Sequence, residues 1–113
     1  MSRYSCSYLV KNSPARLELL YDDLLNLSVF EVMHRRSDRF VLVEMPGKVS
    51  FSQLVTIELF NKIVSPSEIQ IELLVKNNEL PLRVNNRCRQ CFDAIHQIIT
   101  EHYRGICLTK ISA

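Results

Sequence analysis

Residues 68–76, with the sequence EIQIELLVK, alternate between apolar and polar side chains over almost their whole length. Ile69, Ile71 and Val75 fall on one side of an extended chain, because successive side chains of a β-strand point to opposite faces. A helix would need a repeat of 3.6 residues instead. The segment therefore predicts a strand with one buried face, although the SPSE tetrapeptide at 65–68 also fits a helix capping box.

A second alternating run covers residues 80–84, after the polar Asn77-Asn78 pair. Alternating runs on either side of residues that tolerate left-handed backbone predict a hairpin that pairs 68–76 with 80–84. Pro81 has no backbone N–H to donate, so we expect the returning strand at the edge of the sheet.

The N-terminal part of the chain predicts a strand followed by a helix. Residues 3–10 alternate strictly, which is typical of a half-buried strand. Ser13 is expected to cap a helix that begins at Pro14, since proline is well accommodated at the first helical position. Leucines and Tyr21 recur at helical spacing behind it and predict a helix over 14–26 with one apolar face.

The next segment predicts further strands. Residues 29–34 and 39–45 favour β-structure, and the RRSD tetrapeptide at 35–38 separates them as a turn. Residues 40–43 are apolar at every position, which predicts a strand inside the sheet with both faces covered. Residues 49–63 fit either structure, because their Val, Ile, Thr and Phe content favours a strand while an i, i+3 apolar stripe suits a helix. We favour the strand.

The last helix has the clearest pattern in the chain. Apolar side chains recur at three- and four-residue steps and predict an amphipathic helix over 87–103. Asn85 or Asn86 is expected to cap its start, and Gly105 is expected to end it. Residues 106–113 are expected to form a short tail of mixed composition, either docked on the domain or frayed.

Together these segments predict one α+β domain over residues 1–105, followed by the tail 106–113. The expected order of elements is β-α-β-β-β-β-β-α. Strands joined by short turns are mostly antiparallel, so they would form a five- to six-stranded meander sheet. Two amphipathic helices would cover one face of this sheet and give a two-layer domain.

The composition points to a single globular domain. The chain has 113 residues, of which 47% are hydrophobic and 23% charged, and its net charge is +2. Its uncharged apolar runs are far shorter than the ~20 residues that cross a bilayer, and its start lacks the apolar core of a signal peptide. We therefore expect a soluble cytoplasmic protein that does not bind membranes and whose cysteines are reduced.

Cys88 and Cys91 form a C-x-x-C motif near the start of the last helix, with Arg87 and Arg89 beside the first thiol. A thiol at a helix N-terminus beside cations is typical of redox proteins. Both cysteines also lie on the apolar stripe of the helix, where cysteine acts as a small hydrophobic residue. We favour this structural role over a thiol redox site. A zinc site would need two further ligands at suitable spacing.

Other catalytic patterns are missing from the sequence. The motifs of hydrolases and phosphate-binding loops are absent, and the chain has only 2 glycines. Asp93 and His96 lie three residues apart on one helical face and could share a hydrogen bond, but such surface pairs are common without catalysis. We therefore expect no enzyme activity and no bound cofactor.

Basic residues gather at two places in the sequence. One group lies at the predicted hairpin turn, and the other precedes and opens the last helix: Arg35, Arg36 and Arg39, and Arg83, Arg87 and Arg89. If both groups reached one surface, they would form a positive patch able to bind phosphates or an acidic partner. Aromatic residues interleaved with them, as expected for single-stranded nucleic acid, are absent.

The predicted sheet has more apolar surface than two helices can cover. Leu9, Leu74 and the second face of 40–43 point away from the helical layer, and a monomer would expose them. Alternatively, a helical 49–63 or the C-terminal tail covers that side.

The sequence thus favours a non-enzymatic protein-binding adaptor or regulatory domain. It would dock through the uncovered sheet face, oriented by the arginines, onto another protein or a symmetric copy of itself. One alternative is a nucleic-acid-associated regulator that places the same arginines on phosphates. The other is a thiol redox protein that uses Cys88 and Cys91.

Overall fold

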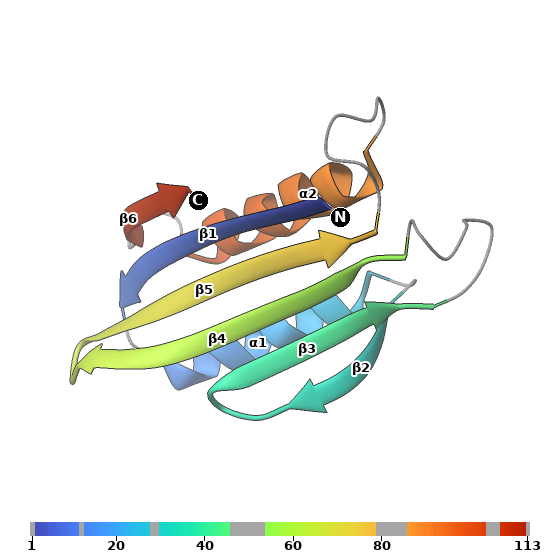
Figure 1. Ribbon diagram of the computed structural model, residues 1–113. Helices are drawn as coiled ribbons and strands as arrows, with labels where there is room; N and C mark the ends of the chain where they lie inside the picture. Colours follow the sequence, from blue (N-terminus) through green and yellow to red (C-terminus); the bar gives the residue numbers. More distant parts are fainter. Residues whose placement is uncertain are drawn as a thin grey trace.

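The computed structural model describes residues 2–11, 13–27, 30–45, 54–78, 86–103 and, for the backbone alone, 107–112. These residues form six strands and two helices (Figure 1). In chain order they are β1 (Ser2–Lys11), α1 (Pro14–Leu25), β2 (Phe30–Arg35), β3 (Arg39–Glu44), β4 (Thr56–Ser65), β5 (Glu68–Asn77), α2 (Arg87–His102) and β6 (Cys107–Ser112).

The strands form one antiparallel sheet in the order β2-β3-β4-β5-β1-β6. Strands β2 to β5 follow one another as a meander. Strand β1 lies next to β5 and pairs with β6 on its other side, so β2 and β6 are the edge strands. Both helices lie on the same face of the sheet (Figure 1). The predicted α+β architecture is therefore confirmed.

The two helices begin and end within one residue of the predicted ranges. Pro14 opens α1, and the Asn86 side chain accepts a hydrogen bond of 2.9 Å from the backbone N–H of Arg89 at the start of α2. The cap leaves fewer unpaired N–H groups at this helix end. Gly105, the predicted C-cap, lies outside the described residues.

The predicted hairpin partner of 68–76 needs correction. Strand β5 does form, but it follows β4 in a hairpin whose turn is Pro66-Ser67, so the SPSE tetrapeptide is a turn and not a helix cap. The uncertain segment 49–63 is strand from Thr56 onward. Residues 80–84 lie outside the described part of the chain.

The C-terminal segment also differs from the order of elements that the sequence predicts. Residues 107–112, treated as a tail by the sequence analysis, form β6 and pair with β1. The described elements therefore end on a strand, and the observed order is β-α-β-β-β-β-α-β. Six mixed residues are too few for periodicity to distinguish a docked strand from a frayed end.

The hydrophobic core lies between the helices and the face of the sheet that they cover. Side chains at alternate positions of β1, β3, β4 and β5 meet the apolar stripes of both helices. The largest fully buried ones include Tyr8, Phe40, Leu42, Ile57, Leu59, Ile71, Leu73, Leu20, Tyr21 and Ile95. Tyr21 and Phe40 stack with their ring centroids 4.3 Å apart, which joins α1 to β3.

Strand β3 lies inside the sheet, between β2 and β4, as the apolar run 40–43 predicted. Its Phe40 and Leu42 are fully buried under the helices. The prediction that both faces are covered is met only in part within the described residues. Both helices lie on one side, and on the other side Val41 is buried while Val43 stays partly exposed.

Candidate functional site

The face of the sheet opposite the helices, here called the open face, is not covered by either described helix (Figure 1). It consists of the alternate strand positions whose neighbours enter the core. These are Arg3, Ser5, Ser7, Leu9 and Lys11 of β1, Arg39, Val41 and Val43 of β3, Thr56, Glu58, Phe60 and Lys62 of β4, and Glu68, Gln70, Glu72, Leu74 and Lys76 of β5.

The middle of the open face is hollowed. Ser5 and Ser7 are small, so their positions on β1 lie lower than the neighbouring Phe60 and Leu74 on β4 and β5. The hollow has a volume of about 260 Å³, with Arg3 and Glu72 among its lining residues. Two apolar walls, a hydroxyl floor and charges of both signs suit contact with a protein side chain.

Charges on the open face pair with one another across the strands. Glu58 lies 3.3 Å from Arg39 and 3.6 Å from Lys76, and its side chain is only 13% exposed. The Arg39 guanidinium also lies over the Phe60 ring, 5.3 Å from its centroid. These contacts hold the Arg39 side chain against the sheet, and Glu58 partly neutralises its charge within the domain.

Arg35 belongs to the other side of the molecule. Its Nη2 donates to Glu18 at 2.6 Å and to Asp22 at 3.1 Å, both on α1. The hydrogen bond to Glu18 raises the pKa of Arg35 above its already high ordinary value. The guanidinium also lies 5.6 Å from the ring centroid of Tyr21, so Arg35 attaches β2 to the first helix.

Arg87 makes the most buried ion pair of the described residues. Its Nε donates to the two carboxylate oxygens of Glu44 at 2.9 and 2.8 Å. The Glu44 side chain is 2% exposed and also accepts a bond from the backbone N–H of Val55 at 3.2 Å. Because Arg87 opens α2, this pair ties the helix to the end of β3.

The remaining predicted arginines are on the surface or outside the described chain. Arg89 pairs with Asp93 at 3.2 Å, and its guanidinium lies 5.4 Å from the ring centroid of Tyr4. Arg36 is exposed at the β2–β3 turn, and no carboxylate among the described residues lies within ion-pair distance of it. Arg83 is not described.

The two arginine groups do not meet on one surface. Arg39 and Glu44 are the two ends of β3, which a strand of six residues separates by about 17 Å. Arg35, Arg36 and Arg39 lie at the Arg39 end of β3, whereas Arg87 contacts Glu44 at the other end. Arg35 also faces the helices while Arg39 faces the opposite side of the sheet. The described arginines therefore do not form the single positive patch that the sequence allowed.

The C-x-x-C motif places its two thiols in different surroundings. The Cys88 thiol is fully buried and donates hydrogen bonds to the carbonyls of Val75 at 3.2 Å and Ser2 at 3.7 Å. A fully buried thiol in contact with backbone carbonyls suits a structural role better than a nucleophile, which needs access and a cation nearby. Cys91 is partly exposed, and both are free thiols.

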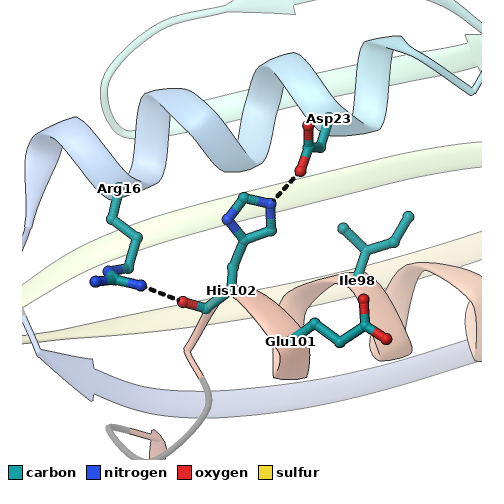
Figure 2. Close-up of a pocket in the computed structure, with 5 residues that line it drawn as sticks. All are labelled: Arg16, Asp23, Ile98, Glu101 and His102. Carbon is teal, nitrogen blue, oxygen red and sulfur yellow. Dashed lines mark hydrogen bonds and ion pairs between the residues drawn. The ribbon is translucent and has the colours of Figure 1, made fainter.

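A groove of about 480 Å³ lies between α1 and the C-terminal turns of α2 (Figure 2). Its lining includes Arg16 and Asp23 of α1 and His102 of α2. His102 Nε2 lies 2.5 Å from Asp23 Oδ2, and Arg16 donates to the backbone carbonyl of His102 at 2.6 Å (Figure 2). The Arg16 contact satisfies a carbonyl at the end of α2, so these residues fasten the helices together.

Sequence analysis missed the His102–Asp23 pair because 79 residues separate its members. The only signal available was a histidine in the last turn of a helix, which favours positive charge in general. The groove itself is lined by Arg16, Asp23, Ile98, Glu101 and His102, so the described lining supplies no hydroxyl or thiol nucleophile for the imidazole to activate.

The histidine of the predicted Asp93–His96 pair has a close contact elsewhere. His96 Nδ1 lies 2.5 Å from the Tyr8 hydroxyl, and the two rings stack with centroids 5.7 Å apart. This contact fixes α2 over β1.

Comparison with known proteins adds no assignment. No protein-family model matches the chain, and no curated protein matches its sequence. Within the described ranges, His, Cys, Asp and Glu side chains nowhere gather in threes that could hold a metal ion. Neither helix among these residues has the length and apolar character needed to span a membrane.

Proposed function

We propose that this chain is a protein-binding adaptor or regulatory domain that acts by contact and not by catalysis. The open face is the binding surface, and the occupant is the open face of a second copy. The observation that carries this proposal is that both described helices cover the same side of the sheet. Leu9, Val43, Phe60 and Leu74 on the other side consequently stay partly exposed.

The size of the open face supports a stable contact. Strands β1, β4 and β5 have 10 residues each, which corresponds to about 33 Å of length. Together with β3 they span about 19 Å across, at ~4.8 Å per strand. The footprint is therefore about 600 Å² per copy, or about 1,200 Å² in total, which reaches the lower end of the range of specific interfaces.

The charges of the open face support a protein partner over a nucleic acid. Glu58, Glu68 and Glu72 lie between the basic side chains of the same face. A polyanion would meet these carboxylates, whereas a copy of the chain presents lysines and arginines that can pair with them. The arginine partners described above would also have to be broken before phosphates could bind Arg35, Arg39 or Arg87.

Sedimentation equilibrium of the full chain tests the proposal. We expect the wild-type chain to dimerise and the Leu74→Glu variant to be monomeric, because the substitution removes an apolar contact and burying the new carboxylate in the interface costs free energy of desolvation. Leu19→Glu is the matched control, since Leu19 is 60% exposed on the outer side of α1. Ser7→Arg is a second variant, which would fill the hollow of the open face without altering the core.

The outcomes are distinct. Monomeric Leu74→Glu and Ser7→Arg chains with native circular dichroism, beside a dimeric Leu19→Glu chain, would support the open face as the interface. A wild-type chain that stays monomeric at millimolar concentration would overturn the proposed occupant. A monomer that binds DNA, and loses it steeply with salt, would favour the nucleic-acid alternative.

A further inference from the structure

Strand β4 continues beyond the end of its neighbour β3. The two strands pair from Thr56 to Phe60, while β4 runs on to Ser65 in its pairing with β5. In Figure 1 the β4–β5 hairpin projects past β3. Residues 62–65, here called the β4 step, therefore have a strand on one side only within the described chain.

The backbone N–H and C=O groups of Ile63, in the β4 step, point toward this unpaired side. The N–H of Asn61 donates to the carbonyl of Asp38 at 2.8 Å, on the side of β3. Backbone N–H and C=O groups alternate in direction along an antiparallel strand, so those of Ile63 point the same way. Unpaired edge groups of this kind are a template for another extended chain.

An apolar groove lies directly beside the step. Ile63 is opposite Ile69 of β5, and Pro14 and Leu17 at the start of α1 complete the apolar lining. The groove has a volume of about 440 Å³. Ile63 is 73% exposed although its neighbour Ile69 is buried. Ser37 and Asp38 of the β2–β3 turn bound the groove at the end of β3.

We propose that the β4 step binds an extended peptide segment of a partner protein by strand addition. The segment lies in line with β3 and antiparallel to β4, and its main chain bonds to Ile63. Its residue opposite Ile63 is aliphatic and enters the groove. The following residue lies opposite Lys62 and is acidic, because directly opposed side chains of opposite charge stabilise a strand pair.

Of the residues that line this groove, Lys62 alone also belongs to the open face, so substitutions at Ile63 and Leu74 test the two proposals separately. The chemistry of the occupant follows from three features of the step. The unpaired main chain requires an extended ligand, the lining of Pro14, Leu17 and Ile69 requires an aliphatic side chain, and the exposed Lys62 favours a carboxylate beside it.

Fluorescence anisotropy with labelled hexapeptides tests the proposal on the full chain. The probes have the form Ser-Thr-Ser-Thr-Val-Z with an amidated C-terminus, and Z is glutamate, glutamine or lysine. They end at Z because Asp38 already bonds to Asn61, the next residue along β4. We expect the glutamate peptide to bind at least tenfold more tightly than the lysine peptide. Methylation of the valine amide nitrogen should reduce binding at least tenfold, since it removes the hydrogen bond to the Ile63 carbonyl.

Two substitutions locate the site. Ile63→Lys should abolish binding, and Leu19→Lys should leave it unchanged, because both residues are exposed and only Ile63 borders the groove. Lys62→Glu should reverse the preference from the glutamate to the lysine peptide. The Leu74→Glu chain should bind the peptides as the wild type does, which separates this result from that of the open face.

Failure of all three peptides to bind would overturn the proposal. So would equal binding of the N-methylated peptide, since it would show apolar adhesion without strand pairing. A preference that Lys62→Glu does not change would overturn the assigned register.

Discussion

Replacing Arg87 by methionine would leave the Glu44 carboxylate buried without its cation. Glu44 is 2% exposed, and the remaining hydrogen bond from Val55 would not compensate for its charge. Removing one member of a buried ion pair costs about 3–5 kcal/mol. Arg87 is 29% exposed, so solvent weakens the pair, and we expect about 3 kcal/mol. The total free energy of unfolding of a domain of this size is typically about 5–15 kcal/mol, so this loss would be easy to measure.

Urea unfolding followed by circular dichroism measures this loss. The matched control is Arg89→Met in the same first turn of α2, where both members of the ion pair are more than half exposed. Such a pair contributes about 0.5 kcal/mol. The double variant Glu44→Gln/Arg87→Met should recover most of the stability, because no buried charge remains. A loss below about 1 kcal/mol in Arg87→Met, or a double variant no more stable than it, would refute the reasoning.

Two other predictions concern Tyr103 and the cysteines. Burial raises the pKa of Tyr103 to about 12, and its hydroxyl has no hydrogen-bond partner among the described residues. The unfolded chain loses this proton nearer pH 10, so the free energy of unfolding should fall between about pH 10 and pH 12. The fall should be smaller in Tyr103→Phe, and urea midpoints measured across this pH range would show the difference. At neutral pH the phenylalanine variant should be as stable as the wild type or up to about 1 kcal/mol more stable; a clear loss would reveal a partner for the hydroxyl. In native protein, iodoacetamide should label Cys91 before Cys88, because the Cys88 thiol is fully buried; mass spectrometry of the peptides checks the order, and rapid labelling of Cys88 would favour the redox alternative.

Local patterns in the sequence were sufficient to predict the elements with strong periodicity. The alternation of Ile69, Ile71 and Leu73 predicted β5, and the apolar stripe of α2 predicted its core contacts. Both patterns show which side chains share one face of a strand or helix. The face of each side chain is set by its spacing from residues close in the sequence. For the same reason Cys88 was correctly expected in the core.

Pairing between distant segments could not be predicted in the same way. The hairpin partner of β5 was placed after it because Asn77-Asn78 is a good turn, whereas Pro66-Ser67 forms the observed turn before it. Both dipeptides are compatible with a turn, and only the pairing of the whole sheet decides between them.

The candidate site shows the same limit. Arg35, Arg39 and Arg87 are adjacent to other basic residues in the sequence, so they suggested a patch. Their carboxylate partners are 13 to 43 residues away, and the fold brings these together. Charge neutralised by a distant residue has no local signature, so a cluster of like charges in the sequence overstates the field at the surface.

The position of β1 has a consequence for biosynthesis. Ser2 pairs with Asn77, and Cys6 pairs with both Leu73 and Ser112, so β1 is an interior strand whose two neighbours are made after it. Until β5 leaves the ribosome, the alternating apolar side chains of β1 have no sheet to join. Such a high contact order slows folding. A chain whose synthesis stops before β5 would present β1 unpaired to chaperones and proteases.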